Sequence, residues 1–204
     1  MARIDDYLEA RRIAVDVLNA RALDAICNRS GCDSPDGQSL NVPFLDRRYR
    51  VGYPDFPFDD RDDPERAVPI QEQVLILHYL MGAGAPSPSG QWIAYREIPG
   101  AAFYYSAFVK RAIDPLKKGF GGRPERLSAL APRIGGQAVE AGDVGFEFLP
   151  LPKVPLQMVL YAGDDEFPPE AGILFDRSVD GYLSPEDAAW MAGMVVYRLM
   201  ALDR

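Results

Sequence analysis

The sequence contains few of the side chains that most often bind metals or act as nucleophiles. One histidine, His78, and two cysteines, Cys27 and Cys32, occur among its 204 residues. Three such side chains cannot make a zinc site of four cysteine or histidine ligands, or a four-thiolate iron–sulfur cluster, within one chain. A GxSxG nucleophile motif is also missing, and any Ser–His or Cys–His arrangement has to use His78. These absences argue against hydrolytic nucleophiles and against a metal site built from cysteine and histidine.

Positive charge and long apolar runs are scarce as well. The chain has 22 basic and 30 acidic residues, a net charge of −8, whereas a nucleic-acid-binding protein needs a basic face. The longest apolar run, Val74 to Met81, is interrupted by His78 and falls short of the ~20 residues that span a bilayer. The amino terminus, MARIDDYLEARR, lacks the apolar core of a signal peptide. We therefore expect a cytoplasmic protein without nucleic-acid or membrane partners, in which Cys27 and Cys32 are free thiols rather than a small disulfide.

Apolar residues follow helical spacing in some segments and strand spacing in others, without a fixed repeat or a regular β-α order. This pattern predicts an α+β fold, a single domain with a mainly antiparallel sheet packed by about five helices. Residues 1–38 are expected to form an N-terminal helix and loop, and residues 39–204 the α+β domain. The proline- and acid-rich residues 53–66 are predicted to be an exposed connector without regular structure. The predicted helices are 4–26, 69–81, 105–119, 124–134 and 185–202, and the predicted strands are 39–51, 91–98, 144–149 and 156–161.

His78 lies in VLILHYLMG, within the most apolar of the predicted helices. A buried imidazole can be an axial ligand of a bound macrocycle, or a general base that titrates near neutral pH. It can equally be a histidine without a function of its own, hydrogen-bonded to a backbone carbonyl or a carboxylate, because burial requires a partner. The sequence leaves these alternatives open, and His78 is the first candidate site residue.

A second candidate region, WIAYREIPGAAFYYSAF, is dense in aromatic rings. These rings can line a pocket for a flat ligand, with Arg96 and Glu97 fixing its polar groups. They can instead be core packing between a strand and the helix that follows it. The candidate site residues here are Trp92, Arg96, Glu97 and Tyr105.

Acidic residues cluster after the strand predicted at 156–161, where a functional loop can lie. Their carboxylates can bind Mg²⁺ or Ca²⁺, or act as an acid–base pair, although their spacing matches no calcium-binding loop. A solvated acidic turn is the alternative. The prolines of Phe167–Pro169 make the loop stiff, which favours a preorganised arrangement. The cluster comprises Asp164, Asp165, Glu166, Glu170 and Asp176, of which Asp165, Glu166 and Asp176 are candidate site residues.

Four ordered segments resemble the family called domain of unknown function 3786, over about residues 40 to 202. They are LHYLMGAGAPSPSGQWIAYREIPG, YYSAFVKRAIDPL, LPKVPLQMVLYAGDDEFPPEAGILFD and YLSPEDAAWMAG. The resemblance implies a protein of bacterial or archaeal anaerobes. Some members are fused to a four-cysteine iron–sulfur domain similar to that of corrinoid iron–sulfur proteins. This chain lacks such a domain, so the resemblance implies an iron–sulfur or corrinoid protein as a partner rather than as part of the chain.

Three functions are therefore considered, and the sequence identifies no cofactor. The first is a cytoplasmic accessory protein of anaerobic metabolism that binds a small molecule or cofactor. Its site would lie between the His78 helix, the Trp92–Glu97 strand and the loop at 164–166. The second is an enzyme that uses Glu97, Asp165 or Glu166 as acid–base groups, with or without a divalent metal. The third is a protein-interaction subunit. The candidate ligand-binding residues are His78, Trp92, Arg96, Glu97, Tyr105, Asp165, Glu166 and Asp176.

Overall fold

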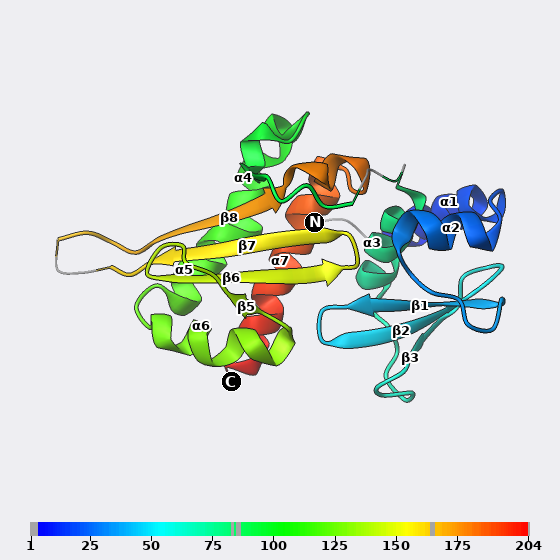
Figure 1. The fold of residues 1–204 in the computed structure, drawn as a ribbon, viewed down its shortest axis with the longest axis horizontal. Helices are drawn as coiled ribbons and strands as arrows, with labels where there is room; N and C mark the ends of the chain where they lie inside the picture. Colours follow the sequence, from blue (N-terminus) through cyan, green and yellow to red (C-terminus); the bar gives the residue numbers. More distant parts are fainter. Residues whose placement is uncertain (1–3, 83, 85–86, 164–165, 204) are drawn as a thin grey trace.

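Two antiparallel β-sheets form the framework of the computed structural model, which describes residues 4–82, 84, 87–163 and 166–203 (Figure 1). The strands are β1 (Ser39–Phe44), β2 (Arg47–Gly52), β3 (Phe58–Asp60), β4 (Trp92–Ala94), β5 (Gln137–Ala138), β6 (Val144–Leu151), β7 (Val154–Tyr161) and β8 (Glu170–Asp176). The smaller sheet has the order β1-β2-β3, and the larger has the order β4-β8-β7-β6-β5. The predicted α+β class with antiparallel strands is confirmed, with the strands divided between two sheets.

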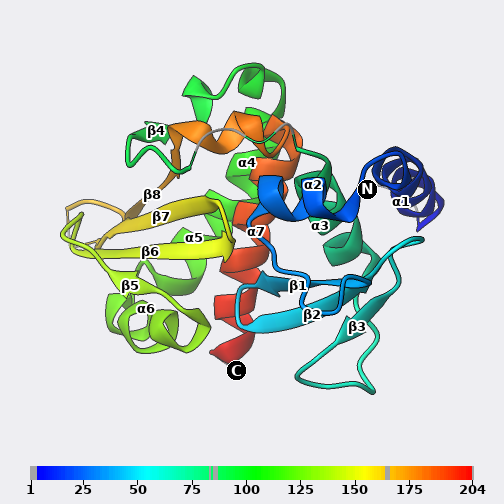
Figure 2. The same ribbon diagram turned by 45° about the vertical axis from the view of Figure 1, so that its right-hand side comes forward.

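Helices cover the larger sheet on one side and gather beside the smaller one. They are α1 (Ile4–Asn19), α2 (Leu23–Ser30), α3 (Ile70–Met81), α4 (Tyr105–Phe108), α5 (Asp114–Phe120), α6 (Pro124–Leu130) and α7 (Pro185–Leu202), and a π turn, Val109–Ile113, joins α4 to α5. Figures 1 and 2 show α5, α6 and α7 on one side of the larger sheet, and α1, α2 and α3 near the smaller sheet. Among the described residues, no helix has both the length and the apolar character that crossing a membrane requires.

Ser184 caps the start of α7, which lies where the sequence predicts a helix over residues 185–202. Ser184 Oγ accepts a hydrogen bond from the backbone N–H of Asp187 at 3.1 Å, which satisfies one of the free N–H groups of the first turn. Pro185 takes the first helical position, where its missing N–H has no helical partner to lose. This start fixes Glu186 and Asp187 in the first turn, where Asp187 reaches His78 on α3.

The prediction of one helix over residues 4–26 is wrong, because the chain turns at residues 20–22 and forms α1 and α2. Ala22 has extended backbone angles, φ −68° and ψ 144°, which end the helical path. The Arg21 guanidinium donates a hydrogen bond to the carbonyl of Met81 at 2.8 Å, at the carboxyl end of α3. The apolar spacing continues through the turn because Leu23 and Ile26 on α2 are also buried. Periodicity alone therefore could not locate the break.

Residues 53–66 also differ from the prediction of an exposed, irregular connector. They contain β3, which pairs with β2, and both Phe56 and Asp60 are buried. Asp60 accepts hydrogen bonds from the backbone N–H groups of Asp62, at 2.9 Å, and Asp63, at 3.1 Å. Its other oxygen accepts a bond from Arg66 Nε at 2.9 Å. Asp60 is thus one of the acids on which the prediction of an exposed segment was based, yet it is buried and its hydrogen bonds stabilise the turn that follows β3.

The sequence analysis did not identify β8, which lies between β4 and β7 in the larger sheet. Ile173 and Phe175 are buried and alternate with less buried residues, the spacing of a strand. Acidic residues at both of its ends, Glu170 and Asp176, obscured this short pattern. β4 in turn is shorter than the predicted strand 91–98, because the chain enters a 3₁₀ turn at Tyr95–Glu97.

A nearly buried charge network joins the smaller sheet to α3 and α7. Glu72 on α3 accepts a hydrogen bond from the Tyr49 hydroxyl and lies 3.4 Å from Arg47 Nη1. The guanidinium of Arg198 on α7 lies 3.5 Å from Glu72 and 3.4 Å from Asp46. The Glu72 side chain is only 13% exposed, so water screens these interactions weakly. The network therefore fixes α3, which carries His78, against the neighbouring elements.

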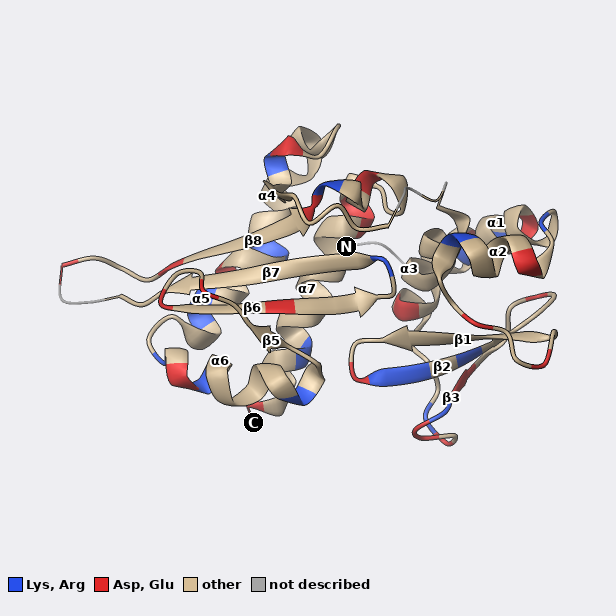
Figure 3. Ribbon diagram, viewed as in Figure 1, with Lys and Arg blue, Asp and Glu red and all other residues tan. Residues whose placement is uncertain are grey.

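The other arginines of β2 are also paired with acids. Figure 3 shows basic residues along β2 and acidic residues in the turns around it. Arg48 forms an ion pair with Asp62, and Arg50 lies 3.0 Å from Asp36. The positive charge that gathers on β2 is therefore balanced locally by carboxylates.

Candidate functional site

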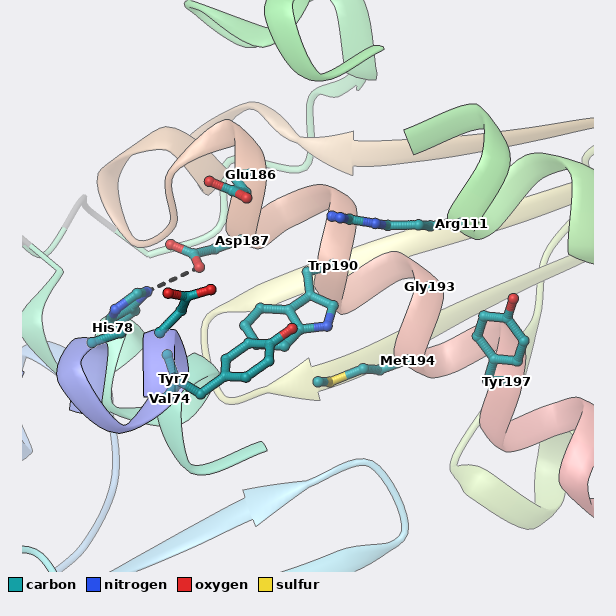
Figure 4. Close-up of a pocket in the computed structure, with 12 residues that line it drawn as sticks. Tyr7, Val74, His78, Arg111, Glu186, Asp187, Trp190, Gly193, Met194 and Tyr197 are labelled. Atoms are coloured by element: carbon teal, nitrogen blue, oxygen red, sulfur yellow. Dashed lines mark hydrogen bonds and ion pairs between the residues drawn. The ribbon is translucent and has the colours of Figure 1, made fainter. Parts of the chain in front are cut away.

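A cavity of about 560 Å³ lies beside His78 (Figure 4). It is bounded by side chains from α1, α3, the π turn and α7. The α7 residues that reach it recur at spacings of three and four, so they occupy one face of the helix. The lining residues are Asp6, Tyr7, Ala10, Val74, His78, Arg111, Glu186, Asp187, Trp190, Gly193, Met194 and Tyr197.

Two stacked aromatic rings line this cavity. The rings of Tyr7 on α1 and Trp190 on α7 lie with their centroids 5.3 Å apart and their planes inclined by 28°. Both residues are half-buried, and Met194 lies one turn beyond Trp190 on the same helix. Aromatic faces and a thioether offer polarisable apolar contact to a ring or chain of a ligand.

His78 is hydrogen-bonded to a carboxylate, which was one of the alternatives left open by the sequence. Its Nδ1 lies 2.9 Å from Asp187 Oδ1, and the other Asp187 oxygen accepts a hydrogen bond from Ser184 Oγ at 2.7 Å. The hydrogen bond to Asp187 raises the pKa of His78 above its ordinary value, against the opposing effect of burial. The negative charges of Asp187 and Glu186 act in the same direction as the hydrogen bond. Asp187 therefore both orients the imidazole and favours its protonated form.

Replacing Asp187 by asparagine is expected to lower the pKa of His78, because the neutral amide no longer stabilises the imidazolium. A folded-state pKa above the ordinary value of 6.5 makes the pair stabilise the fold fully below pH 6.5. That stabilisation is lost as the pH rises through the higher folded-state pKa. Because the chain has a single histidine, its NMR titration is unambiguous. A titration unchanged by Asp187→Asn, relative to the control Asp180→Asn, would contradict this account.

The π turn brings Arg111 to the cavity. The predicted helix 105–119 is confirmed in extent and continues to Phe120, but residues 109–113 are wound as a π-helix. π-Bulges are frequent at functional sites, because the extra residue changes which side chains face a neighbour. Gly193 allows the backbone of the π turn to lie close to α7, since a Cβ at this position would be only 3.0 Å from the Arg111 carbonyl oxygen. In Figure 4 the Arg111 side chain extends along the cavity towards the end that holds Glu186.

The cavity supplies acid–base chemistry rather than nucleophiles or a metal site. His78 can exchange a proton near neutral pH, oriented by Asp187. Cys27 and Cys32 are free thiols outside the lining, and burial raises the pKa of Cys32 to about 11. Within the described part of the chain, no group of three or more histidine, cysteine, aspartate or glutamate residues is arranged to hold a metal ion. A second hollow, of about 630 Å³, reaches His78 and Asp187 from the side of residues 180–185.

The predicted aromatic region forms a separate cluster. The Arg96 guanidinium lies 3.7 Å from the centre of the Tyr105 ring, a cation–π contact. Tyr95 and Phe108 stack with their centroids 4.2 Å apart, as core packing predicts. The Glu97 carboxylate accepts a hydrogen bond from the backbone N–H of Ala94 at 2.7 Å. Arg96 therefore contacts Tyr105, and Glu97 binds the backbone of Ala94. None of these three candidate residues lines the cavity at His78.

The remaining predicted site residues lie around β8. Asp176 is 1% exposed and accepts hydrogen bonds from the backbone N–H groups of Ser89, Gly90 and Ser178 at 2.7 to 3.0 Å. Trp92 lies opposite Asp176 in the pairing of β4 with β8. Glu166 is exposed in the β7–β8 connection, which Figure 1 shows at the far end of the molecule from α3. Asp165 lies outside the described residues.

The structure therefore does not bring the Trp92–Glu97 segment or Glu166 to the cavity at His78. Sequence reasoning found His78 but missed its companions in the lining. The segment YLSPEDAAWMAG contains Glu186, Asp187 and Trp190, but the sequence analysis used it only for the family resemblance and as part of a predicted helix. The spacing of Glu186, Trp190 and Gly193 along α7 was the available signal for one shared helix face.

The comparisons with known proteins give a family and no further relatives. A family model described as "Domain of unknown function (DUF3786)" matches residues 22–198. The matched range runs from the start of α2 to the last turn of α7, so it includes most of the cavity lining. No curated protein and no solved structure shows significant similarity to the chain.

Proposed function

The chain belongs to the DUF3786 family, and from the geometry of its own residues we propose that it binds a small organic molecule in the cavity beside His78. One observation carries this proposal: a single cavity combines a stacked aromatic surface with an oriented histidine and charged groups of both signs. Its volume of about 560 Å³ lies within the range of small-molecule sites, about 300 to 1,000 Å³.

The wider setting proposed for this function is cytoplasmic, without a nucleic-acid partner. The net charge of −8 supports the second part, because it disfavours approach to a phosphate backbone. A role in anaerobic metabolism, and an iron–sulfur or corrinoid protein as partner, remain predictions that rest on the family resemblance.

An enzyme remains the second proposal, with a changed choice of residues. Glu97 was one of the expected acid–base groups, but its carboxylate is occupied by the Ala94 N–H. His78 is better placed, because it lines the cavity and has the oriented carboxylate partner that general bases commonly use. If the bound molecule undergoes a reaction, we propose that His78 exchanges a proton with it.

Binding in this cavity is expected to change the fluorescence of Trp190. The variant Trp92→Phe leaves Trp190 as the only tryptophan, so a titration with a library of small aromatic molecules reports on the cavity alone. Adding Ala10→Phe, which places a ring in the cavity from α1, is expected to weaken binding of each hit at least about tenfold, or ~1.4 kcal/mol.

The matched control is Leu8→Phe, at an exposed position of the same helix outside the lining. It is expected to leave the affinities unchanged. Hits that bind Ala10→Phe as tightly as the parent would place the binding site elsewhere. A library without any hit would contradict the proposed function.

A further inference from the structure

Two charged side chains in the cavity lining have no partner in the part of the chain that the structure describes. Arg111 and Glu186 form neither a hydrogen bond nor an ion pair through their side chains with any other described residue. Asp187, by contrast, is engaged with both His78 and Ser184. The cavity therefore presents one positive and one negative group whose interactions are left to solvent or to a ligand.

Glu186 and the aromatic surface belong to the same face of α7. Trp190 follows Glu186 by four residues, one helical turn, so their side chains lie one above the other. Gly193 lies on the same face, and it admits the π turn that carries Arg111. Figure 4 shows the Arg111 side chain and the Glu186 carboxylate above the Trp190 ring. A ligand ring packed against Trp190 would therefore have both a guanidinium and a carboxylate on one side of it.

We propose that the cavity binds an aromatic zwitterion of amino-acid type, with its ring against Trp190, its carboxylate towards Arg111 and its ammonium towards Glu186. This inference rests on the proposed function and specifies its ligand. A simple anion would meet the charges of Glu186 and Asp187, and a simple cation would meet Arg111 and the protonated form of His78. Only a ligand with both charges complements both of these groups.

Four probes with the same phenylethyl skeleton test this assignment. Phenylalanine carries both charges, phenethylamine only the ammonium, 3-phenylpropionate only the carboxylate, and 2-phenylethanol neither. Each is titrated against the Trp92→Phe protein, with Trp190 fluorescence as the readout. Phenylalanine is expected to bind most tightly, about threefold to tenfold better than either singly charged probe, the range for one partly solvated charge contact.

Charge-removing variants assign each end of the ligand. Arg111→Met is expected to reduce phenylalanine binding to the level of phenethylamine, and Glu186→Gln to the level of 3-phenylpropionate. Arg133→Met removes an exposed arginine outside the lining, and Glu125→Gln follows Pro124 at the start of α6 as Glu186 follows Pro185. Both controls are expected to leave all four affinities unchanged.

The outcomes separate this inference from the proposed function. If 2-phenylethanol binds as tightly as phenylalanine and the variants change nothing, the cavity binds aromatic molecules but is not selective for a zwitterion, and the inference fails alone. If 3-phenylpropionate or phenethylamine binds best, the ligand carries a single charge and the inference also fails. If none of the four binds while the aromatic library gives hits that Ala10→Phe weakens, the assigned ligand class is wrong. A library without hits overturns both proposals.

Discussion

Replacing Glu72 by alanine is expected to lower the free energy of unfolding by about 3 to 5 kcal/mol, as when one partner of a buried ion pair is removed. The variant leaves the nearly buried guanidinium of Arg47, 14% exposed, without its carboxylate. It also removes the acceptor of the Tyr49 hydroxyl and one of the two acids beside Arg198. Urea denaturation followed by circular dichroism measures the change.

The exposed residue Glu65, in the segment before α3, supplies the control, and Glu65→Ala is expected to change stability by less than about 0.5 kcal/mol. The double variant Glu72→Met with Arg47→Met should recover much of the loss, because it removes the charge that Glu72→Ala leaves unpaired. A cost for Glu72→Ala no larger than that for Glu65→Ala would mean that water screens the network and that it does not hold α3 in place.

Replacing Asp176 by alanine is expected to lower the free energy of unfolding by about 3 to 4 kcal/mol, because several buried donors lose a charged acceptor. Those donors are the backbone N–H groups of Ser89, Gly90 and Ser178. Asp180→Ala, at an exposed position in the following 3₁₀ turn, is the control and should cost little. If both variants unfold at the same denaturant concentration, Asp176 does not hold the segment before β4 to β8.

The same carboxylate gives an acid dependence of stability with a defined direction. Burial alone would raise the pKa of Asp176, but the hydrogen bonds from Ser178, Ser89 and Gly90 outweigh it and lower the pKa from 3.8 to about 2. A lowered folded-state pKa stabilises the protein fully above pH 3.8, and this stabilisation is lost as the pH falls from 3.8 towards 2. The difference corresponds to about 2 kcal/mol. Asp176→Asn should therefore flatten the stability profile over that interval.

The sequence was most successful in predicting helices and strands whose type and ends are determined by their own residues. α3 and α7 have long apolar faces and clear end signals, and β6 and β7 alternate regularly, so all four occur where expected. The break between α1 and α2 and the strand β8 were missed for a common reason. In both, local spacing was compatible with two structures, and contacts with distant segments decided between them. Arg21 with Met81, and β8 with β4 and β7, are such contacts.

The candidate site shows the same limit more strongly. His78 was identified because a lone histidine in an apolar helix is conspicuous. The sequence analysis expected a backbone carbonyl or a carboxylate as its partner but did not say which residue would provide it. That partner, Asp187, lies 109 residues away along the chain. Arg111 reaches the cavity through a π turn that periodicity does not reveal, and Tyr7 through the packing of α1 on Trp190. Sequence reasoning could therefore name residues suited to a site, but not which of them the fold would bring together.

The π turn also has an evolutionary consequence. A π-helical turn accommodates one residue more than the α-helix around it, so residues 109–113 amount to a single-residue insertion in an otherwise continuous helix. Loss of that residue in another member of the family would restore regular winding and change which side chains this turn presents, while the helix on either side keeps its place. Such a member would keep the sheets and α7 but present a different residue than Arg111 to the cavity. A one-residue gap at this position in the family would therefore mark a change in the cavity lining rather than a change of fold.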